Sequence, residues 1–119
     1  MSVSLTEQAV VERRKTVTRR RGWRFLRPGD RLTLCRKVMG RRSGEPLVRL
    51  AEVEVENVRR EPLLWVTREE AEREGFPGWS GWEFIQFFTD HMGGSPDQEV
   101  TRIQWRYLLG VDDPRLLGR

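Results

Sequence analysis

The stretch Lys15-Thr16-Val17-Thr18-Arg19-Arg20-Arg21 places one amine, two hydroxyls and three guanidinium groups in seven consecutive positions. A lysine crowded by fixed positive charges loses part of its preference for the proton, and a threonine beside such an amine can be activated as a nucleophile. Arginine side chains attract phosphates because the guanidinium fork matches phosphate oxygens. The stretch therefore predicts a loop that combines chemistry with recognition. The alternative is a basic surface segment ahead of the turn at Pro28-Gly29-Asp30.

The composition fits one folded domain over residues 1–119, with a core over about residues 5–109 and a tail over 110–119. Five Trp and five Phe supply bulky core material, and the charged fraction of 34% predicts a heavily charged surface. Only two of the 22 basic residues, Lys15 and Lys37, are lysines. Arginine in such excess suits phosphate recognition or ion-pair networks.

Charge is distributed unevenly along the chain. Residues 13–37 carry eleven basic side chains against one acid, Asp30, whereas residues 52–74 carry eight glutamates. A bipolar protein can steer an anion to one face. The alternative is that the two segments pair with each other inside the fold.

Three capping boxes mark helix starts, because in each a Ser or Thr is followed three residues later by Glu. The pairs are Ser4–Glu7, Thr67–Glu70 and Ser80–Glu83. They predict a helix over about residues 5–13, a short acidic helix ending at Gly75, and a longer helix ending at Gly93-Gly94. The longest carries an apolar stripe of Phe84, Phe87, Phe88 and Met92.

Between these helices the hydrophobic period changes to two, which predicts half-buried antiparallel strands. The alternating runs are Leu32–Val38, Ala51–Glu56 and Arg102–Tyr107. The phase slips between Leu50 and Ala51, and again before Val58, as at bulges that curve a sheet. The turn region Gly40–Pro46 predicts a hairpin between the first two strands.

Metal and membrane functions find little support in the sequence. Cys35 and His91 are single, so neither a disulfide framework nor a zinc site of cysteines and histidines can form, and Cys35 is expected in the core. We expect no metal and no cofactor. The chain has no apolar signal segment and no run of 18 apolar residues, which favours a cytoplasmic protein with no membrane partner.

Several short motifs follow one another between about Leu5 and Leu109. They are Lys15–Arg20, Pro28–Leu32, Gly75–Gly78, Glu83–Phe88 and Val100–Leu108. In this order and spacing they resemble the ASCH domain family, a group of small proteins in the PUA-like superfamily. The Lys-Thr-x-Thr element, the Gly-Asp turn and the terminal strand carry most of the likeness.

The resemblance implies an α+β fold, a small antiparallel β-barrel with about three short flanking helices and a cleft lined by the motif loop. The family is associated with RNA and modified nucleosides, and one branch hydrolyses N4-acetylcytidine without a metal by means of a lysine, a threonine and a glutamate. Carried over by motif, these are Lys15, Thr18 and Glu74, with Glu70 and Glu72 close enough to leave the choice of carboxylate open. The stretch Gly75–Trp82 departs from that branch.

Substrate or RNA contacts are expected from residues around the motif. They are Arg14, Thr16, Arg19, Arg20, Arg21 and Trp23.

Hydrolysis of an acylated exocyclic amine needs a nucleophile, a base and a proton donor to the leaving nitrogen. Thr18 would attack, unprotonated Lys15 would act as the base, and Glu74 would position the lysine or assist departure. Arg14, Arg19 and burial would lower the pKa of Lys15, and Glu74 would raise it. The alternative is that Lys15 and Glu74 form an ordinary ion pair.

Three functions remain open on the sequence. The first is an amidohydrolase that acts on an acylated nucleoside. The second is a non-catalytic RNA-binding module, or a ribonuclease, that uses the Arg-rich loop with Trp23 or Trp79 as a stacking platform. The third is an accessory protein with a peptide or protein partner. Phosphate binding would weaken steeply with salt, whereas nucleoside hydrolysis would not.

Overall fold

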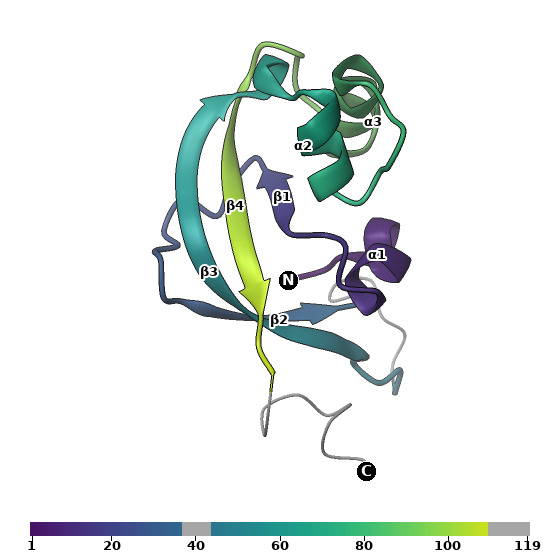
Figure 1. The fold of residues 1–119 in the computed structure, drawn as a ribbon, viewed down its shortest axis with the longest axis vertical. Helices are drawn as coiled ribbons and strands as arrows, with labels where there is room; N and C mark the ends of the chain where they lie inside the picture. The colour runs from purple at the N-terminus through teal and green to yellow at the C-terminus, as the bar shows by residue number, and fades with distance from the viewer. Residues whose placement is uncertain (37–43, 110–119) are drawn as a thin grey trace.

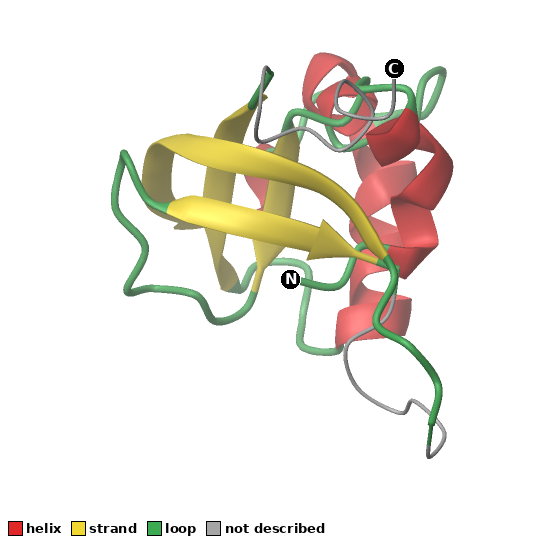
Figure 2. Cartoon of the chain, turned by 90° about the horizontal axis from the view of Figure 1, so that it is seen from below, coloured by secondary structure: helices red, strands yellow, loops and turns green. Residues whose placement is uncertain are grey.

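The computed structural model describes residues 1–36 and 44–109 as a curved antiparallel sheet with short helices gathered on one side (Figures 1 and 2). The strands pair in the order β1-β4-β3-β2. The elements in chain order are η1 (Ser4–Thr6), α1 (Glu7–Val11), β1 (Val17–Arg20), β2 (Arg31–Cys35), β3 (Arg49–Pro62), η2 (Leu63–Trp65), α2 (Arg68–Arg73), α3 (Gly81–Met92) and β4 (Glu99–Tyr107).

Strand β3 organises the sheet, because its 14 residues pair with β2 at one end and with β4 along the rest. Its side chains alternate as predicted, with Ala51, Val53 and Val55 buried. The predicted phase slips are confirmed as irregularities of register. Leu50 is skipped where β3 pairs with β2, and Glu56 is skipped where β3 pairs with β4. Such bulges bend a strand, and β3 is strongly curved in Figure 1.

The four described strands do not close into the predicted barrel, since β1 pairs only with β4 and β2 only with β3. The N-terminal segment occupies part of the β2 edge that closure would use. Val3 N donates to Cys35 O at 2.9 Å, and Cys35 N donates to Met1 O at 2.8 Å. The predicted hairpin between β2 and β3 is antiparallel as expected, but most of its turn, like Val38 and the tail, lies outside the described residues.

All three predicted helices exist, but their caps differ. Helix α3 has the complete predicted capping box of Ser80 and Glu83, and it ends at Gly93. At α2 only half of the box forms, because Thr67 accepts from the Glu70 backbone while the Glu70 carboxylate turns to arginines.

The box predicted at Ser4 and Glu7 is wrong. The chain enters α1 through the η1 turn, which has no side-chain cap, and Glu7 instead binds the Arg36 guanidinium.

Two hydrophobic clusters fill the interior. One lies between the sheet and α1 and consists of Val3, Val10, Leu26, Leu34, Ala51, Val53, Val55, Ile103 and Trp105. The other packs α2 and α3 against the β3–β4 end and consists of Leu63, Val66, Ala71, Phe84, Ile85, Phe88 and Val100. The free thiol of Cys35 is buried, as expected.

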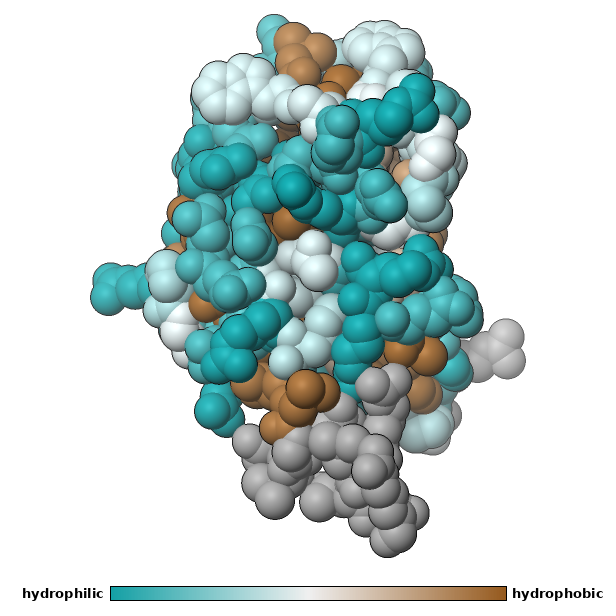
Figure 3. All heavy atoms as spheres, viewed as in Figure 1, coloured by the Kyte–Doolittle hydropathy of each residue, from teal (hydrophilic) through white to brown (hydrophobic). Residues whose placement is uncertain are grey.

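Hydrophilic side chains cover most of the face shown in Figure 3 and leave hydrophobic residues in separate small patches. Within the described residues, no helix combines the length and apolar character needed to cross a bilayer.

Candidate functional site

A cavity of about 130 Å³ lies between β1, the N-terminal segment and α3. Its polar wall consists of Lys15, Thr18, Arg19, Arg20 and Glu74. Its apolar wall includes Phe76, Phe84, Phe87, Phe88 and Met92. The structure therefore brings the three residues carried over by motif, Lys15, Thr18 and Glu74, to one hollow.

The motif that borders this cavity is not a loop, as the sequence suggested, but leads into a strand. Val17–Arg20 forms β1, in which Thr18 pairs with Ile103 and Arg19 with Arg102 of β4. Lys15 and Thr16 precede the strand. The half-buried Thr16 is fixed through its backbone, because its N–H donates to Arg73 O at 2.9 Å and its carbonyl accepts from Trp105 N at 3.0 Å. The Thr16 and Lys15 backbone is thus tied to the sheet and to α2.

Lys15 is 2% exposed and is held at both ends. Its Nζ donates to the Glu74 carbonyl at 2.8 Å and to Glu74 Oε1 at 3.2 Å. Its own carbonyl accepts from the Trp105 indole N–H at 3.0 Å and from the Tyr107 hydroxyl. These side-chain and backbone contacts together hold the amine at the cavity wall.

The pKa of Lys15 is lowered, and burial is the main cause. The charge of Glu74 opposes this effect, whereas Arg20 and Arg19 add to it. The sequence left open whether burial or the charge of Glu74 has the larger effect on this pKa. In the folded protein, burial has the larger effect. Arg14, expected to contribute, is exposed and pairs with Glu12 at 2.6 Å instead.

Glu74 is the member of the acidic helix that faces the cavity. It caps the C-terminus of α2, where its N–H donates to Glu70 O at 3.0 Å. Gly75 follows with φ of +107°, and a Cβ there would lie 3.0 Å from the Ala9 Cβ. A glycine is therefore required to end α2 against α1 directly after Glu74. Glu72, one of the alternatives, is exposed.

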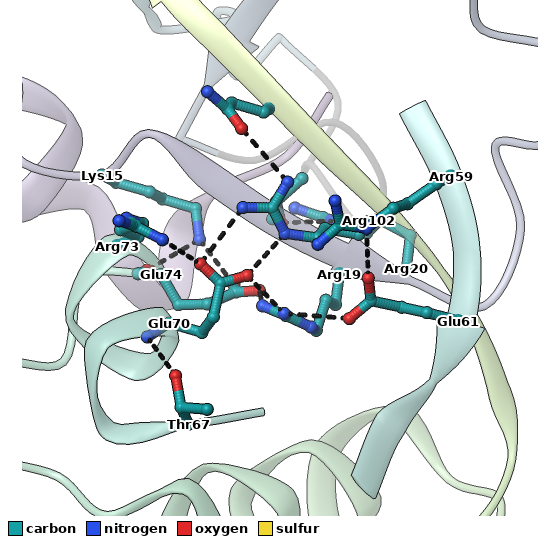
Figure 4. A network of polar contacts seen from close by, with 12 residues as sticks. Lys15, Arg19, Arg20, Arg59, Glu61, Thr67, Glu70, Arg73, Glu74 and Arg102 are labelled. Carbon is teal, nitrogen blue, oxygen red and sulfur yellow. Dashed lines mark hydrogen bonds and ion pairs between the residues drawn. The ribbon is translucent and has the colours of Figure 1, made fainter. Parts of the chain in front are cut away.

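Behind the cavity lies a buried ionic network centred on Arg19, whose side chain is 0% exposed (Figure 4). Its guanidinium donates to Glu70 at 2.7 Å, to Glu74 at 3.0 Å and to Glu61 at 3.3 Å. Arg102 of β4 also binds Glu70 through two nitrogens. Arg19, expected to contact substrate, is thus mainly a partner of carboxylates.

Sequence reasoning missed Glu61 and Arg102 because strand alternation carries no sign of which buried charges will meet across a sheet. The segments of Arg19 and Glu61, residues 13–37 and 52–74, were however considered as partners inside the fold, and this pairing is what Arg19 makes with Glu61, Glu70 and Glu74.

Charge balance in this region bears on Lys15. Four guanidinium groups, those of Arg19, Arg59, Arg73 and Arg102, bind the three carboxylates of Glu61, Glu70 and Glu74. The negative charges are therefore compensated without a proton on Lys15. A buried network favours neutrality because an uncompensated charge in a poorly solvated region is costly. This balance agrees with the lowered pKa of the lysine.

Thr18 and Arg20 form the other polar pair of the cavity wall. Arg20 Nε donates to Thr18 Oγ1 at 3.2 Å, and Arg20 Nη2 donates to Ser2 O at 2.8 Å. The guanidinium plane is therefore fixed on two sides, with Arg20 still lining the cavity. A positive group fixed beside a hydroxyl can stabilise negative charge that develops on its oxygen.

The remaining predicted contact residues, Arg21 and Trp23, do not line the cavity. Arg21 is exposed and donates to the Met92 carbonyl at 3.1 Å. Trp23 is half-buried and packs against the cluster under the sheet, with φ of +62°. In residues 1–36 and 44–109, no group of three or more His, Cys, Asp or Glu side chains is arranged to hold a metal ion.

No protein-family model and no curated protein matches this chain. Solved structures do. Protein EF3133 from Enterococcus faecalis, assigned to the DUF984 family, is 18% identical with a TM-score of 0.62, covering 86% of this chain and 66% of that one. An ASCH domain from Lactobacillus crispatus is 13% identical with a TM-score of 0.59, covering 87% of this chain and 70% of that one. A mutant of ZmASCH from Zymomonas mobilis is 18% identical with a TM-score of 0.54, covering 89% of this chain and 66% of that one.

This chain thus spans about two thirds of the length of the neighbours from Enterococcus faecalis and Zymomonas mobilis. At such identities the likeness concerns the fold alone. An open four-stranded sheet with three short helices, matched over most of the chain by ASCH domain structures, gives this protein the fold of an ASCH domain.

Proposed function

We propose that the cavity is the active site of a metal-independent amidohydrolase that removes an acyl group from the exocyclic amine of a nucleoside. The substrate suggested by the resemblance is N4-acetylcytidine. One observation carries the proposal: a buried lysine with a lowered pKa shares one small cavity with a threonine hydroxyl and a carboxylate. A base, a nucleophile and an orienting group are the parts that acyl transfer needs.

Lys15 is suited to the role of base by its hydrogen bonds. A neutral amine has two N–H bonds and one lone pair. Two donations from Nζ go to Glu74, so the lone pair of the neutral amine turns away from Glu74 toward the cavity. Glu74 therefore orients the base. Because Glu74 also accepts from Arg19 at 3.0 Å, its negative charge is shared and does not depend on a lysine proton.

The reaction balances with these groups alone. Lys15 takes the proton of the Thr18 hydroxyl as the oxygen attacks the acyl carbon. When the C–N bond breaks, the Lys15 ammonium returns that proton to the leaving nitrogen, which yields the free amine. Water then attacks the acyl-threonine ester with Lys15 again as base, and acetic acid leaves as Thr18 regains its proton.

Arg20 is placed to stabilise the negative charge of this pathway. Its Nε donates to Thr18 Oγ1 at 3.2 Å, so an acyl group attacked by that oxygen would place its own oxygen, on which charge builds, beside this guanidinium. A fixed cationic donor in a poorly solvated cavity typically accounts for about 10²–10³-fold in rate. Arg20 therefore has an electrostatic role in the proposal, in addition to substrate contact.

The apolar wall limits what the cavity accepts. Phe76, Phe84 and Phe87 have ring centroids 4.8–6.3 Å apart and present aromatic surface opposite the polar wall. A cavity of about 130 Å³ is smaller than the roughly 300–1,000 Å³ of sites that enclose a whole ligand. We therefore expect it to admit the acylated base, with the ribose left outside.

The decisive experiment incubates the purified protein with N4-acetylcytidine, with and without a chelator, and follows release of cytidine. We expect turnover in both conditions, and loss of about 10²–10⁴-fold in kcat/KM for Lys15→Met and Thr18→Val. Glu74→Gln should also lose activity, whereas Glu72→Gln, which changes an exposed neighbour, should not. An inactive wild type would refute the enzyme proposal for this substrate, and an active Thr18→Val would remove threonine as the nucleophile.

The state of the base can be measured without a substrate. Because the chain has only two lysines, NMR of protein labelled at the lysine Cε gives two signals to follow with pH. The signal that disappears in Lys15→Met belongs to Lys15. We expect it to titrate below the ordinary value of 10.5. A Lys15 amine that keeps its proton up to that value would contradict its role as a base.

A further inference from the structure

We propose that the cavity also binds a small aromatic carboxylate, with the carboxylate against the Arg20 guanidinium and the ring against the phenylalanine wall. The ligand is a monocarboxylate of about the size of benzoate. It has the form of the acid that is released when a bulky acyl group is removed, so its action as an inhibitor rests on the proposed function. Its binding does not rest on that function.

The missing counter-ion of Arg20 is the first reason. Arg20 lines the cavity, and its guanidinium donates to Thr18 Oγ1 at 3.2 Å and to Ser2 O at 2.8 Å. Within residues 1–36 and 44–109, no carboxylate forms an ion pair with this half-buried group. Burial lowers the pKa of Arg20, and the charge of Glu74 opposes this effect only in part. An anion in the cavity would compensate a cation that is withdrawn from water.

Arg20 also retains donors for such an anion. A guanidinium has five N–H bonds, and the contacts with Thr18 and Ser2 use two of them. A carboxylate can accept two parallel N–H bonds from this planar group, which gives a strong charge-assisted pair. Because two contacts already fix the guanidinium plane, binding of the ligand restricts little additional side-chain motion.

The neighbouring Arg19 adds to the positive character of this wall. Its terminal nitrogens bind glutamates, but its Nε–H has no hydrogen-bond partner among the described residues. Arg19 lines the cavity, and its side chain is 0% exposed. A buried donor without an acceptor is unfavourable, so a negatively charged oxygen in the cavity would interact favourably with this N–H.

Glu74 does not oppose the binding of an anion. It is the one carboxylate among the described residues that line the cavity, and both of its oxygens are occupied. Oε1 accepts from Lys15 at 3.2 Å, and Oε2 accepts from Arg19 at 3.0 Å. The charge of Arg20 is therefore not compensated by Glu74, and the lining residues favour an anionic occupant over a neutral or cationic one.

The apolar wall determines the body of the ligand. Phe76 and Phe87 line the cavity with ring centroids 4.8 Å apart and an angle of 57° between the rings. Aromatic rings prefer such tilted contacts, and a third ring can join them in the same way. The volume of about 130 Å³ is close to the roughly 150 Å³ of an apolar cavity that binds benzene. The cavity therefore suits one six-membered ring.

Other occupants match only one of the two walls. Inorganic phosphate would leave the phenylalanine side chains without a contact, and benzamide would leave Arg20 without a counter-ion. An aromatic carboxylate is complementary to both walls.

The first test measures the Kd of the wild-type protein for benzoate, benzamide, acetate and inorganic phosphate by calorimetry. Benzoate should bind about tenfold or more tightly than benzamide, which has the same shape without the charge. It should also bind about tenfold or more tightly than acetate, because the ring adds buried apolar area. Equal affinity for benzoate and benzamide, or phosphate binding as tight as that of benzoate, would overturn the proposal. These comparisons do not depend on the folding of a variant.

Variants with matched controls locate the site. Arg20→Gln should weaken benzoate binding by about tenfold or more and change benzamide binding by less than about twofold. Arg24→Gln, which removes an exposed arginine outside the cavity, should change neither. Phe87→Leu should weaken benzoate binding more than acetate binding, whereas Trp82→Leu, at an exposed position of the same helix, should affect neither. Benzoate binding that survives Arg20→Gln, or that falls equally in Arg24→Gln, would overturn the proposal.

Two further measurements separate this proposal from the enzyme proposal. The Lys15 Cε signal should move when benzoate is added, because Lys15 lines the same cavity. Benzoate should also raise the KM for N4-acetylcytidine without lowering kcat. If the protein has no turnover but benzoate moves the Lys15 signal, the amidohydrolase proposal fails and the carboxylate site stands. If turnover is present but benzoate neither competes nor moves that signal, the carboxylate site alone fails.

Discussion

Two neighbouring parts of one arginine-rich segment reach opposite environments. Arg19, in β1, is completely buried and bound to three carboxylates. Arg24 and Arg27, a few residues later, lie exposed in the loop before β2. Both parts read as the same basic run in the sequence, so the difference arises from what the fold brings to each of them.

The difference is made by distant carboxylates. Glu61 lies at the end of β3, Glu70 lies in α2 and Glu74 caps that helix, and all three bind Arg19. Among the described residues, no comparable set of carboxylates is seen around Arg24 and Arg27 in the loop between β1 and β2, where Asp30 accepts from the Arg27 backbone N–H. An arginine has a structural role where the fold brings carboxylates within hydrogen-bonding distance of it. Otherwise its guanidinium group remains available to ligands. Substitutions in the buried network and at the exposed arginines can test this comparison.

The largest effect is expected from Glu70→Gln, at the centre of the buried part. Burial by itself would raise the pKa of Glu70, but hydrogen bonds from Arg102, Arg73 and Arg19 hold it well below the ordinary value. Removing the charge leaves these arginines uncompensated, which typically costs about 3–5 kcal/mol. Urea denaturation should show this loss. Glu69→Gln, the exposed neighbour, should change stability by less than about 0.5 kcal/mol, and a similar loss in both would refute the central role of Glu70.

The same carboxylate predicts a dependence on pH. Because the pKa of Glu70 is lower in the folded protein than in the unfolded chain, its ionised form stabilises the fold above the unfolded value of about 4.3. This stabilisation is lost as the pH falls below that value toward the folded pKa. The difference in unfolding free energy between wild type and Glu70→Gln should therefore shrink below about pH 4. A difference that stays constant into acid would show that charge is not its cause.

Much of the fold was predictable from local patterns. Alternating apolar residues located β2, β3 and β4, and the phase slips near Leu50 and Val58 located both irregularities of register. Strand β1 was missed because Val-Thr-Arg-Arg shows no alternation, and Arg19 reads as a surface residue. The open sheet was also not predictable, since the sequence carries no sign that Met1 and Val3 would bind the backbone of Cys35 at the edge of β2.

The candidate site was predictable in its members but not in its electrostatics. The family resemblance singled out Lys15, Thr18 and, with Glu70 and Glu72 as alternatives, Glu74, and these three line the cavity. The resemblance could not show that burial outweighs Glu74 in setting the pKa of the lysine, because burial is a property of the packed structure. Nor could it separate Arg19 from its exposed neighbours, since Glu61 and Arg102 meet it only through strand pairing.

A smaller effect is expected from Tyr107→Phe, which removes one of the two donors to the Lys15 carbonyl. The Trp105 indole remains bound at 3.0 Å, and the ring of residue 107 still faces the Arg13 guanidinium, 4.8 Å from its centroid. We expect a loss of about 0.5–1.5 kcal/mol in unfolding free energy, the net value of a typical hydrogen bond. If these two hydrogen bonds to the Lys15 carbonyl position the base, the substitution should lower kcat more than it changes KM. An unchanged kcat with reduced stability would make the contact purely structural.

The smallest effect is expected where an ion pair lies in solvent. Arg106 binds Glu54 at 3.1 Å across β3 and β4, but its side chain is 53% exposed. Water screens such pairs, so Arg106→Ala should change the unfolding free energy by about 0–1 kcal/mol, and added salt should remove any difference. Glu70→Gln, in contrast, should keep most of its effect in salt, because buried charges are screened much less. Equal salt sensitivity of the two variants would erase the distinction between buried and exposed arginines from which both predictions derive.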